Sequence, residues 1–209
     1  MMTQNQLVEV VRTKAPAVPV TLYEAKDFAD AVQYVVDVTE KKRHCEQLMP
    51  VDGETYGPVS ENGFPTMLSR FIAAPGLSDE EYAVLEEKAA GTDINLLRSG
   101  LRNHLGGFDT SITWADALVA DSVTCVVNSN SEEVRLGSMI AEVSVMFVRT
   151  STIVGRLEDA NTVMLDLLNR GGASYTAMIT GPSRTADIER VGALGVHGPL
   201  ELHIVLLEN

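Results

Sequence analysis

A run of glycine, proline and small polar residues near the C-terminus carries the strongest chemical signal in this chain. The segment Gly181–Thr185 follows an apolar run and precedes an acidic, helix-like stretch, and Gly195–Pro199 comes soon after it. Where a strand ends and a helix begins, backbone N–H groups without intrahelical partners point toward whatever lies in front of them. Arg184 adds a forked positive charge. The segment predicts a pocket for an anionic group; the alternative is a tight turn in which Arg184 forms a structural ion pair.

The predicted ligand-binding residues come from this segment and from one further polar stretch. In open α/β sheets, ligands lie outside the carboxyl ends of the strands. His197 stands between two glycines, so it either lines the site or bonds to a neighbouring loop. The full set is Gly181, Ser183, Arg184, Thr185, His197, Arg135 and Ser138.

Three residues are candidates for acid–base or acyl-transfer chemistry, namely His104, Asp116 and Asp121. His104 with Asp109 or Asp116 would make a general acid–base pair if the fold brings them together. Otherwise the two aspartates cap a helix near position 113 and His104 lies in an exposed loop. Asp116 or Asp121 would supply a carboxylate for proton or acyl transfer.

The cysteines do not form a metal-binding motif. Cys45 and Cys125 lie far apart and neither belongs to a C-x-x-C pair, so a four-thiolate cluster or structural zinc site is not expected. Cys125 lies in an apolar, strand-like run, which predicts a buried thiol. The sequence also lacks the dinucleotide, Walker A, zinc-protease and nucleophile-elbow motifs. We therefore expect no metal site and no cofactor in this chain.

Composition bounds the class of protein. A chain of 209 residues buries one sizeable core. Its 29 acidic and 16 basic residues give a formal net charge of -13, which excludes a nucleic-acid partner because phosphate backbones are bound by clustered lysine and arginine. The N-terminal stretch lacks the pattern of a secretory signal, and no apolar run is long enough to span a membrane. A cytoplasmic location is expected.

Alternating helix and strand patterns predict an α/β fold. Apolar residues at helical spacing indicate helices over 24–42, 79–90 and 152–169, and Ser78 with Glu81 forms a capping box before the second. Strands are expected at 18–23, 94–97, 123–127, 143–149, 175–180 and 202–207, and a short helix at 113–120. The strands are β-branched and often lack alternation, as in sheets covered on both faces. The prediction is a three-layer α/β/α domain over 16–209 with a mostly parallel sheet, after an N-terminal tail over 1–15.

Residues 43–77 show little periodicity and repeated proline and glycine. An irregular connection of this length is uncommon in a compact domain. A lid, an oligomer contact and an unrecognised helix pair are the three interpretations of it.

Three blocks of the sequence resemble the LUD-domain family, the lactate utilization protein C group. The first joins Leu97–Leu101 to Thr113–Ala117, and the second joins Arg135–Ser138 to residues 152–160. The third and most specific combines Gly181–Glu189 with Gly195–Pro199. The likeness covers about residues 94–208. Two stretches depart from the family's pattern: Ala120–Thr124 lacks the glycine of A-E-T-G-T, and Met139–Val145 lacks the prolines and histidine of L-L-P-P-x-H-I.

The resemblance implies a fold like that of the NagB, ribose-5-phosphate isomerase and CoA-transferase group. It also implies a non-redox role in the oxidation of L-lactate to pyruvate, beside iron–sulfur partner proteins that hold the clusters. An accessory subunit is favoured over a catalyst that acts by itself. The alternative is an independent enzyme or a sensor that binds a phosphorylated, nucleotide or acyl-CoA anion at Gly181–Thr185. A homo-oligomer is compatible with either role.

Overall fold

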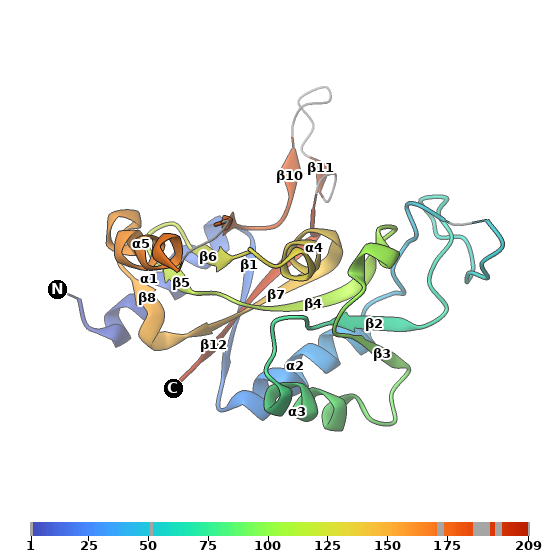
Figure 1. Ribbon diagram of the computed structural model, residues 1–209, viewed down its shortest axis with the longest axis horizontal. Helices are drawn as coiled ribbons and strands as arrows, with labels where there is room; N and C mark the ends of the chain where they lie inside the picture. Colours follow the sequence, from blue (N-terminus) through green and yellow to red (C-terminus); the bar gives the residue numbers. More distant parts are fainter. Residues whose placement is uncertain (1, 51, 171–173, 186–192, 195–197, 209) are drawn as a thin grey trace.

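The centre of the molecule is a six-stranded sheet, shown in the computed structural model of Figure 1. The structure describes residues 2–50, 52–170, 174–185, 193–194 and 198–208. The sheet has the order β1-β12-β7-β4-β2-β3 and all its neighbouring strands are parallel. The strands are β1 (Val20–Ala25), β2 (Arg70–Ala73), β3 (Ile94–Leu97), β4 (Phe108–Trp114), β7 (Ala141–Arg149) and β12 (Glu201–Leu207). The predicted α/β fold with a mostly parallel sheet is confirmed.

Helices cover both faces of this sheet (Figure 1). On one face lie α2 (Phe28–Lys41) and α3 (Asp79–Ala89), which pack on a cluster of buried apolar side chains from β4, β7 and β12. The other face carries α1 (Gln4–Lys14) and α4 (Glu132–Ile140), with a second apolar cluster beneath α1. Helix α5 (Asn161–Asn169) lies on the same side of the molecule but packs on residues 117–126. The predicted capping box is present, because the Ser78 side chain accepts from the Glu81 N–H and the Glu81 side chain accepts from the Ser78 N–H.

A second, smaller sheet lies on the α4 side, with the order β8-β5-β6-β9. Its strands are β5 (Ala117–Val119), β6 (Thr124–Asn128), β8 (Ile153–Val154) and β9 (Thr176–Thr180). The helix predicted over 113–120 is therefore wrong, since these residues end β4 and form β5. They are almost all buried, and a segment covered on both sides shows no period that separates strand from helix.

The helix predicted over 152–169 is correct only in its second half. Its first half contains β8 and two short 3-10 helices, η3 (Thr150–Thr152) and η4 (Leu157–Ala160). Two further 3-10 helices are η1 (Ala15–Ala17) and η2 (Leu101–His104).

The N-terminal segment is part of the folded domain. Helix α1 begins at a capping box formed by Thr3 and Gln6. Its side chains Leu7, Val8 and Val11 are buried in the apolar cluster of β12 and the small sheet. The tail expected over residues 1–15 is therefore a helix that covers one face of the core.

Residues 43–69 form a long excursion between α2 and β2. Backbone hydrogen bonds hold it to itself and to the body: the Gln47 N–H donates to Pro65 O at 2.7 Å and the Leu48 N–H to Gly106 O at 3.1 Å. Large apolar side chains on its outer side are exposed, namely Leu48, Met49, Val59, Phe64 and Leu68. The excursion is an anchored, irregular segment, and the helix pair considered for it is absent from its described residues.

Two short strands, β10 (Arg184–Thr185) and β11 (Ala193–Leu194), form an antiparallel ladder that stands out from the body above α4 (Figure 1). Among the described helices, none combines the length and apolar character that crossing a bilayer requires.

Candidate functional site

A groove between α4 and β9 collects four of the residues predicted to bind a ligand. These are Arg135, Ser138, Gly181 and Ser183. The groove has a volume of about 310 Å³, and we call it the β9 groove. Its lining consists of Ser129, Arg135, Ser138, Met139, Tyr175, Ala177, Met178, Ile179, Thr180, Gly181, Pro182, Ser183, Gly198 and Pro199. Segments far apart in the sequence therefore meet here.

One side of the Arg135 guanidinium is bonded to the protein, and among the described residues the other side is free to bind a ligand. Its Nη1 donates to the carbonyl oxygens of Ser129 at 2.5 Å and Asn130 at 3.0 Å. Its guanidinium carbon lies 5.4 Å from the ring centroid of Tyr175, a cation–π distance. In the described residues, Nε and Nη2 of Arg135 have no hydrogen-bond partner and no carboxylate contacts the group. A guanidinium fixed in this way presents two N–H donors in one plane.

The far wall of the groove is built from two closely approaching backbone segments. Gly181 has a φ of 71°, in the left-handed region that glycine adopts readily. Two residues on, the Ser183 N–H donates to Pro199 O at 2.9 Å. A Cβ on Gly198 would lie 3.3 Å from the Cβ of Ser183, so this position favours glycine. The small residues of Gly181–Thr185 and Gly195–Pro199 thus allow the two backbone segments to approach each other closely.

The remaining predicted ligand residues are only partly within the described structure. The backbone of Arg184 pairs with that of Leu194 in the β10–β11 ladder. The described part of the chain therefore continues from Ser183 into a strand, and the acidic stretch expected as a helix lies outside the described residues, as does His197.

Charge sets the β9 groove apart from four other cavities lined by described residues. Each of those has at least two acidic residues in its lining, whereas the β9 groove has none and has Arg135 as its one charged residue. In a chain with a net charge of -13, such a local reversal favours an anion.

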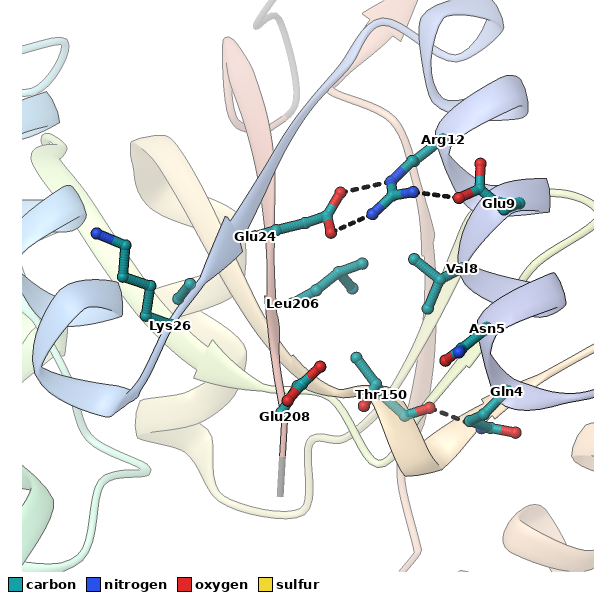
Figure 2. A pocket seen from close by; sticks show the side chains of 11 residues that line it. Gln4, Asn5, Val8, Glu9, Arg12, Glu24, Lys26, Thr150, Leu206 and Glu208 are labelled. Atoms are coloured by element: carbon teal, nitrogen blue, oxygen red, sulfur yellow. Dashed lines mark hydrogen bonds and ion pairs between the residues drawn. The ribbon is translucent and has the colours of Figure 1, made fainter.

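A second cavity, of about 520 Å³, opens where β1, β12 and β7 end at their carboxyl edge (Figure 2). Figure 2 shows that Arg12 points toward Glu24 and Glu9, to which it is bonded. The bond from Arg12 lowers the pKa of the Glu24 carboxyl below its usual value. Because Arg12 is neutralised and Glu208 also lines the cavity, this carboxyl-edge cavity does not offer a free cation from Arg12 to an anion.

The three catalytic candidates lie in separate places. His104 packs against Phe71 with ring centroids 5.5 Å apart. The Oδ2 atom of Asp116 accepts from the Asn128 N–H at 2.6 Å. Asp121 is exposed and lies 3.3 Å from Lys14 Nζ. Neither Asp109 nor Asp116 caps a helix near position 113, because that position is in β4.

The proposed partners of His104 lie at opposite edges of the sheet. Asp109 is at the amino end of β4 and Asp116 lies just beyond its carboxyl end, so about 20 Å of strand separates them. Asp109 bonds to other groups, and no contact joins His104 to either aspartate among the described residues. The structure does not assemble the acid–base pair.

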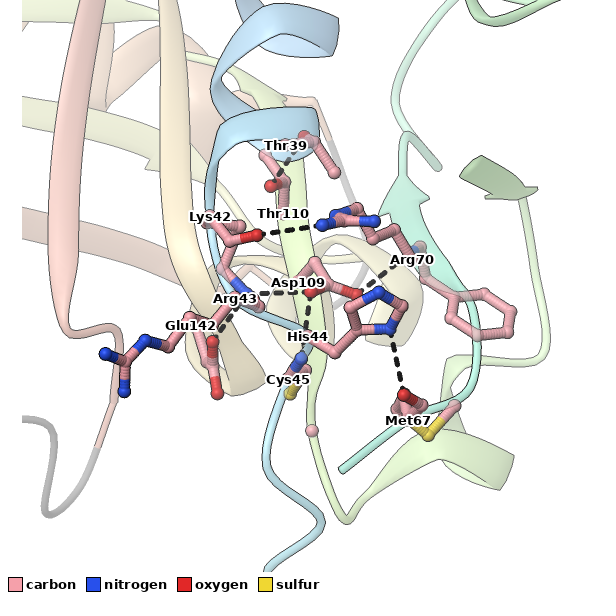
Figure 3. A network of polar contacts seen from close by, with 12 residues as sticks. Thr39, Lys42, Arg43, His44, Cys45, Met67, Arg70, Asp109, Thr110 and Glu142 are labelled. Atoms are coloured by element: carbon pink, nitrogen blue, oxygen red, sulfur yellow. Dashed lines mark hydrogen bonds and ion pairs between the residues drawn. The ribbon is translucent and has the colours of Figure 1, made fainter. Parts of the chain in front are cut away.

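A buried charge cluster at the amino edge of the sheet was not predicted from the sequence (Figure 3). Lys42, at the end of α2, places its Nζ 2.7 Å from Asp109 and 2.6 Å from Glu142, which come from β4 and β7. Asp109 is fully buried and also accepts from the backbone N–H groups of Cys45 and Phe71. We call these three charged residues the Lys42 cluster.

The Lys42 cluster fastens the excursion to the sheet. The Cys45 N–H bonds to Asp109 and the Glu46 N–H bonds to Glu142. Burial lowers the pKa of Lys42, but the two carboxylates outweigh this effect and hold the pKa above its ordinary value. Because Lys42 is charged and each Asp109 oxygen is hydrogen-bonded, we interpret the cluster as structural.

The turn between β5 and β6 holds a strained residue. Val123 has a φ of 52°, a conformation that costs a β-branched residue of the order of 1–2 kcal/mol. It occupies the place of the glycine in the A-E-T-G-T pattern. The positive φ thus occurs at the position where the LUD-domain pattern has glycine, the residue that tolerates a positive φ.

Replacing Val123 by glycine is expected to destabilise the protein less than the same change at Val126. Both side chains are fully buried, but only Val123 relieves backbone strain when it becomes glycine. Urea unfolding should show a difference of about 1–2 kcal/mol between the two variants. Equal losses would mean that position 123 carries no strain.

The fold and groove define an α/β protein with a parallel central sheet and an anion-suited groove beside it. Residues 8–207 match the LUD domain, so the chain belongs to the LUD domain family. It is 30% identical over 133 residues to lactate utilization protein C of Bacillus licheniformis, an alignment that covers 63% of this chain and 53% of that protein. Lactate utilization protein C of Geobacillus kaustophilus is 33% identical over 103 residues, or 48% of this chain and 43% of that one.

The alignments thus span about half the length of these curated relatives. A crystal structure of a DUF162 family protein from Deinococcus radiodurans superposes with a TM-score of 0.61 at 13% identity, and the match covers 99% of each chain. At this identity the likeness shows a shared fold.

Proposed function

We propose that this protein is a cytoplasmic, non-redox component of an L-lactate utilization system, in which iron–sulfur partner proteins transfer the electrons. The observation that carries the proposal is the LUD domain match over residues 8–207, together with aligned relatives that are named lactate utilization protein C. The proposal transfers the role named for those relatives to this chain.

The state of the cysteines supports a role without a cluster in this chain. Cys45 and Cys125 are both free and fully buried. Burial raises the pKa of Cys125 to about 12 and also raises the pKa of Cys45, the latter with help from Glu142 and Asp109. Because the thiolate is the form that binds iron or zinc, these thiols are poor ligands as they stand.

Deleting the gene in its host is expected to abolish or slow growth on L-lactate and to leave growth on glucose unchanged. A plasmid copy should restore growth on lactate. Affinity capture of the tagged protein from lactate-grown cells, read by mass spectrometry, should recover iron–sulfur proteins, with glucose-grown cells as the control. Equal growth of the deletion strain on both carbon sources would contradict the proposal.

An activity assay separates an accessory subunit from an independent catalyst. The purified protein alone should not reduce a dye with L-lactate as the donor, whereas adding it to a lysate of the deletion strain should restore lactate-dependent dye reduction. Turnover of lactate by the purified protein alone would overturn the accessory role.

The β9 groove favours a second candidate, a protein that binds a small anionic ligand as an enzyme or sensor. The phosphorylated, nucleotide and acyl-CoA ligands considered for Gly181–Thr185 belong to this candidate. Its supporting observation is that, among the described residues, the Nε and Nη2 donors of Arg135 are unpaired and the groove lining contains no acidic residue.

A further inference from the structure

We propose that the β9 groove binds a small monocarboxylate with an apolar tail, and that Arg135 is the residue that holds its carboxylate. The inference deepens the second candidate function by naming its ligand class and anchor. It rests on that groove and is independent of the lactate role.

The first argument is that the guanidinium of Arg135 has no carboxylate partner among the described residues. Six described arginines contact carboxylates, namely Arg12, Arg43, Arg70, Arg98, Arg102 and Arg170. Arg135 does not, although Glu132 and Glu133 lie on the same helix, because Glu132 contacts Arg102 and Glu133 bonds to the N–H groups of Gly100 and Leu101. The acidic neighbours are therefore engaged elsewhere.

The second argument is the geometry of the anchor. The two carbonyl oxygens on Nη1 and the ring of Tyr175 fix the guanidinium plane. They leave Nε and Nη2, which form one edge of the fork, for a ligand. Two parallel N–H donors match the two oxygens of a carboxylate.

The third argument is the number of charges. Among the described residues, Arg135 is the one charged side chain that lines the groove. It balances one negative charge, which suits a carboxylate. A phosphate monoester, a pyrophosphate or an acyl-CoA brings two or more negative charges toward a protein whose net charge is -13, and those ligands are bound by several cations or by clustered N–H donors.

The fourth argument is the apolar part of the groove lining. Met139 is 56% exposed, Tyr175 58% and Met178 43%, and all three line the groove beside Pro182 and Pro199. A tail that covers these side chains removes apolar surface from water, which adds about 25 cal/mol per Å² of buried area. The volume of about 310 Å³ lies at the lower end for small-molecule sites.

The test compares three probes of equal chain length by NMR titration and calorimetry of the full-length protein. Hexanoate carries one charge, hexyl phosphate carries close to two, and hexanol carries none. Hexanoate is expected to bind and to shift the resonances of groove residues, and the other two should bind at least about tenfold more weakly, the cost of a poorly matched charged partner. Equal or tighter binding of hexyl phosphate or hexanol would overturn the assignment.

Two variants locate the site. Arg135→Gln should weaken hexanoate binding by about 10- to 100-fold, since a hydrogen-bonded charge pair is lost. Arg156→Gln is the matched control, because the Arg156 guanidinium also has no carboxylate contact among the described residues but lies outside the groove lining. Unchanged affinity in Arg135→Gln, or an equal loss in Arg156→Gln, would overturn the assignment.

Arg135 also bonds to the backbone, so a second variant guards against a folding defect. Met178→Glu places an acidic group in the groove on an exposed side chain and should abolish hexanoate binding without changing the melting temperature. Met178→Gln, similar in shape but uncharged, should lose much less affinity than Met178→Glu. Binding that survives Met178→Glu would contradict the site. Because none of these readouts uses lactate growth, failure here is distinguishable from failure of the lactate role.

Discussion

Replacing Lys42 by methionine is expected to lower the free energy of unfolding by about 3–5 kcal/mol, the cost of removing one partner from a buried ion pair. Lys42 is 15% exposed and Asp109 is not exposed at all. Without Lys42, a buried carboxylate loses its counter-charge and Glu142 loses its short contact at the same time. Urea unfolding should show this loss as a lower midpoint with an unchanged slope.

Lys41→Met is the matched control, because Lys41 is exposed on the same turn of α2 and should change stability by less than about 0.5 kcal/mol. The double variant Lys42→Met/Asp109→Asn should be more stable than Lys42→Met alone, since the uncompensated charge is gone. A Lys42→Met protein as stable as Lys41→Met would show that the cluster contributes nothing.

The same cluster predicts how this stability difference depends on pH. The pKa of Lys42 is raised in the folded protein above its value of about 10.4 in an unfolded chain. A lysine with a raised pKa contributes its full stabilisation below the unfolded value, and loses it as the pH rises through the folded value. The gap between wild type and Lys42→Met should be constant from about pH 7 to 9 and shrink above about pH 10. A gap that closes below pH 9 would contradict this assignment.

The sequence predicted the layers of the fold because their signals are local. The capping box at Ser78 and the apolar face of α2 follow from residues three or four positions apart. Two strands of the small sheet, β6 and β9, were predicted, whereas β5 was missed because it and the end of β4 are buried on both sides and show no period. Strand length and pairing, which distinguish them from a helix, exist only in the folded chain.

The β9 groove and the Lys42 cluster differ in how far the sequence predicted them. Gly181 and Ser183 were found because glycine and serine after an apolar run mark a turn, and Arg135 was found within a block of family likeness. Their meeting was not predictable, since Arg135 and Ser183 are 48 positions apart in the sequence. The Lys42 cluster gave no signal at all, because lysine at a helix end is typical of a solvated surface. Lys42 is buried only because α2 ends over the amino edge of the sheet in the folded protein.

Replacing Gly107 by alanine is expected to lower the free energy of unfolding by about 2–4 kcal/mol. The φ of Gly107 is 112°, a region that residues with a side chain avoid at a cost of about 1–2 kcal/mol. An added Cβ would also lie 3.2 Å from the Sγ of Cys45, and Cys45 is fully buried. Overpacking of this kind costs about 1–3 kcal/mol more.

Gly91→Ala separates the two causes, because Gly91 has a similar φ of 84° but open space around the added Cβ. It should lose the backbone part alone, and the excess loss in Gly107→Ala is then the contact with Cys45. Adding Cys45→Ala to Gly107→Ala should recover that excess, seen as a coupling of about 0.5–3 kcal/mol in a double-mutant cycle. Equal losses at Gly91 and Gly107 would mean that the excursion is not tightly packed here.

Gly107 is also linked to the Lys42 cluster through Cys45. The backbone N–H of Cys45 bonds to Asp109 at 3.0 Å, so a backbone shift of Cys45 that relieves the clash at Gly107 moves a donor away from the buried carboxylate. The effects of Gly107→Ala and Lys42→Met should therefore not add, because residues that share a partner couple. Additive losses would separate the excursion from the cluster, whereas coupled losses would show that Gly107 and Lys42 hold the same segment on the sheet.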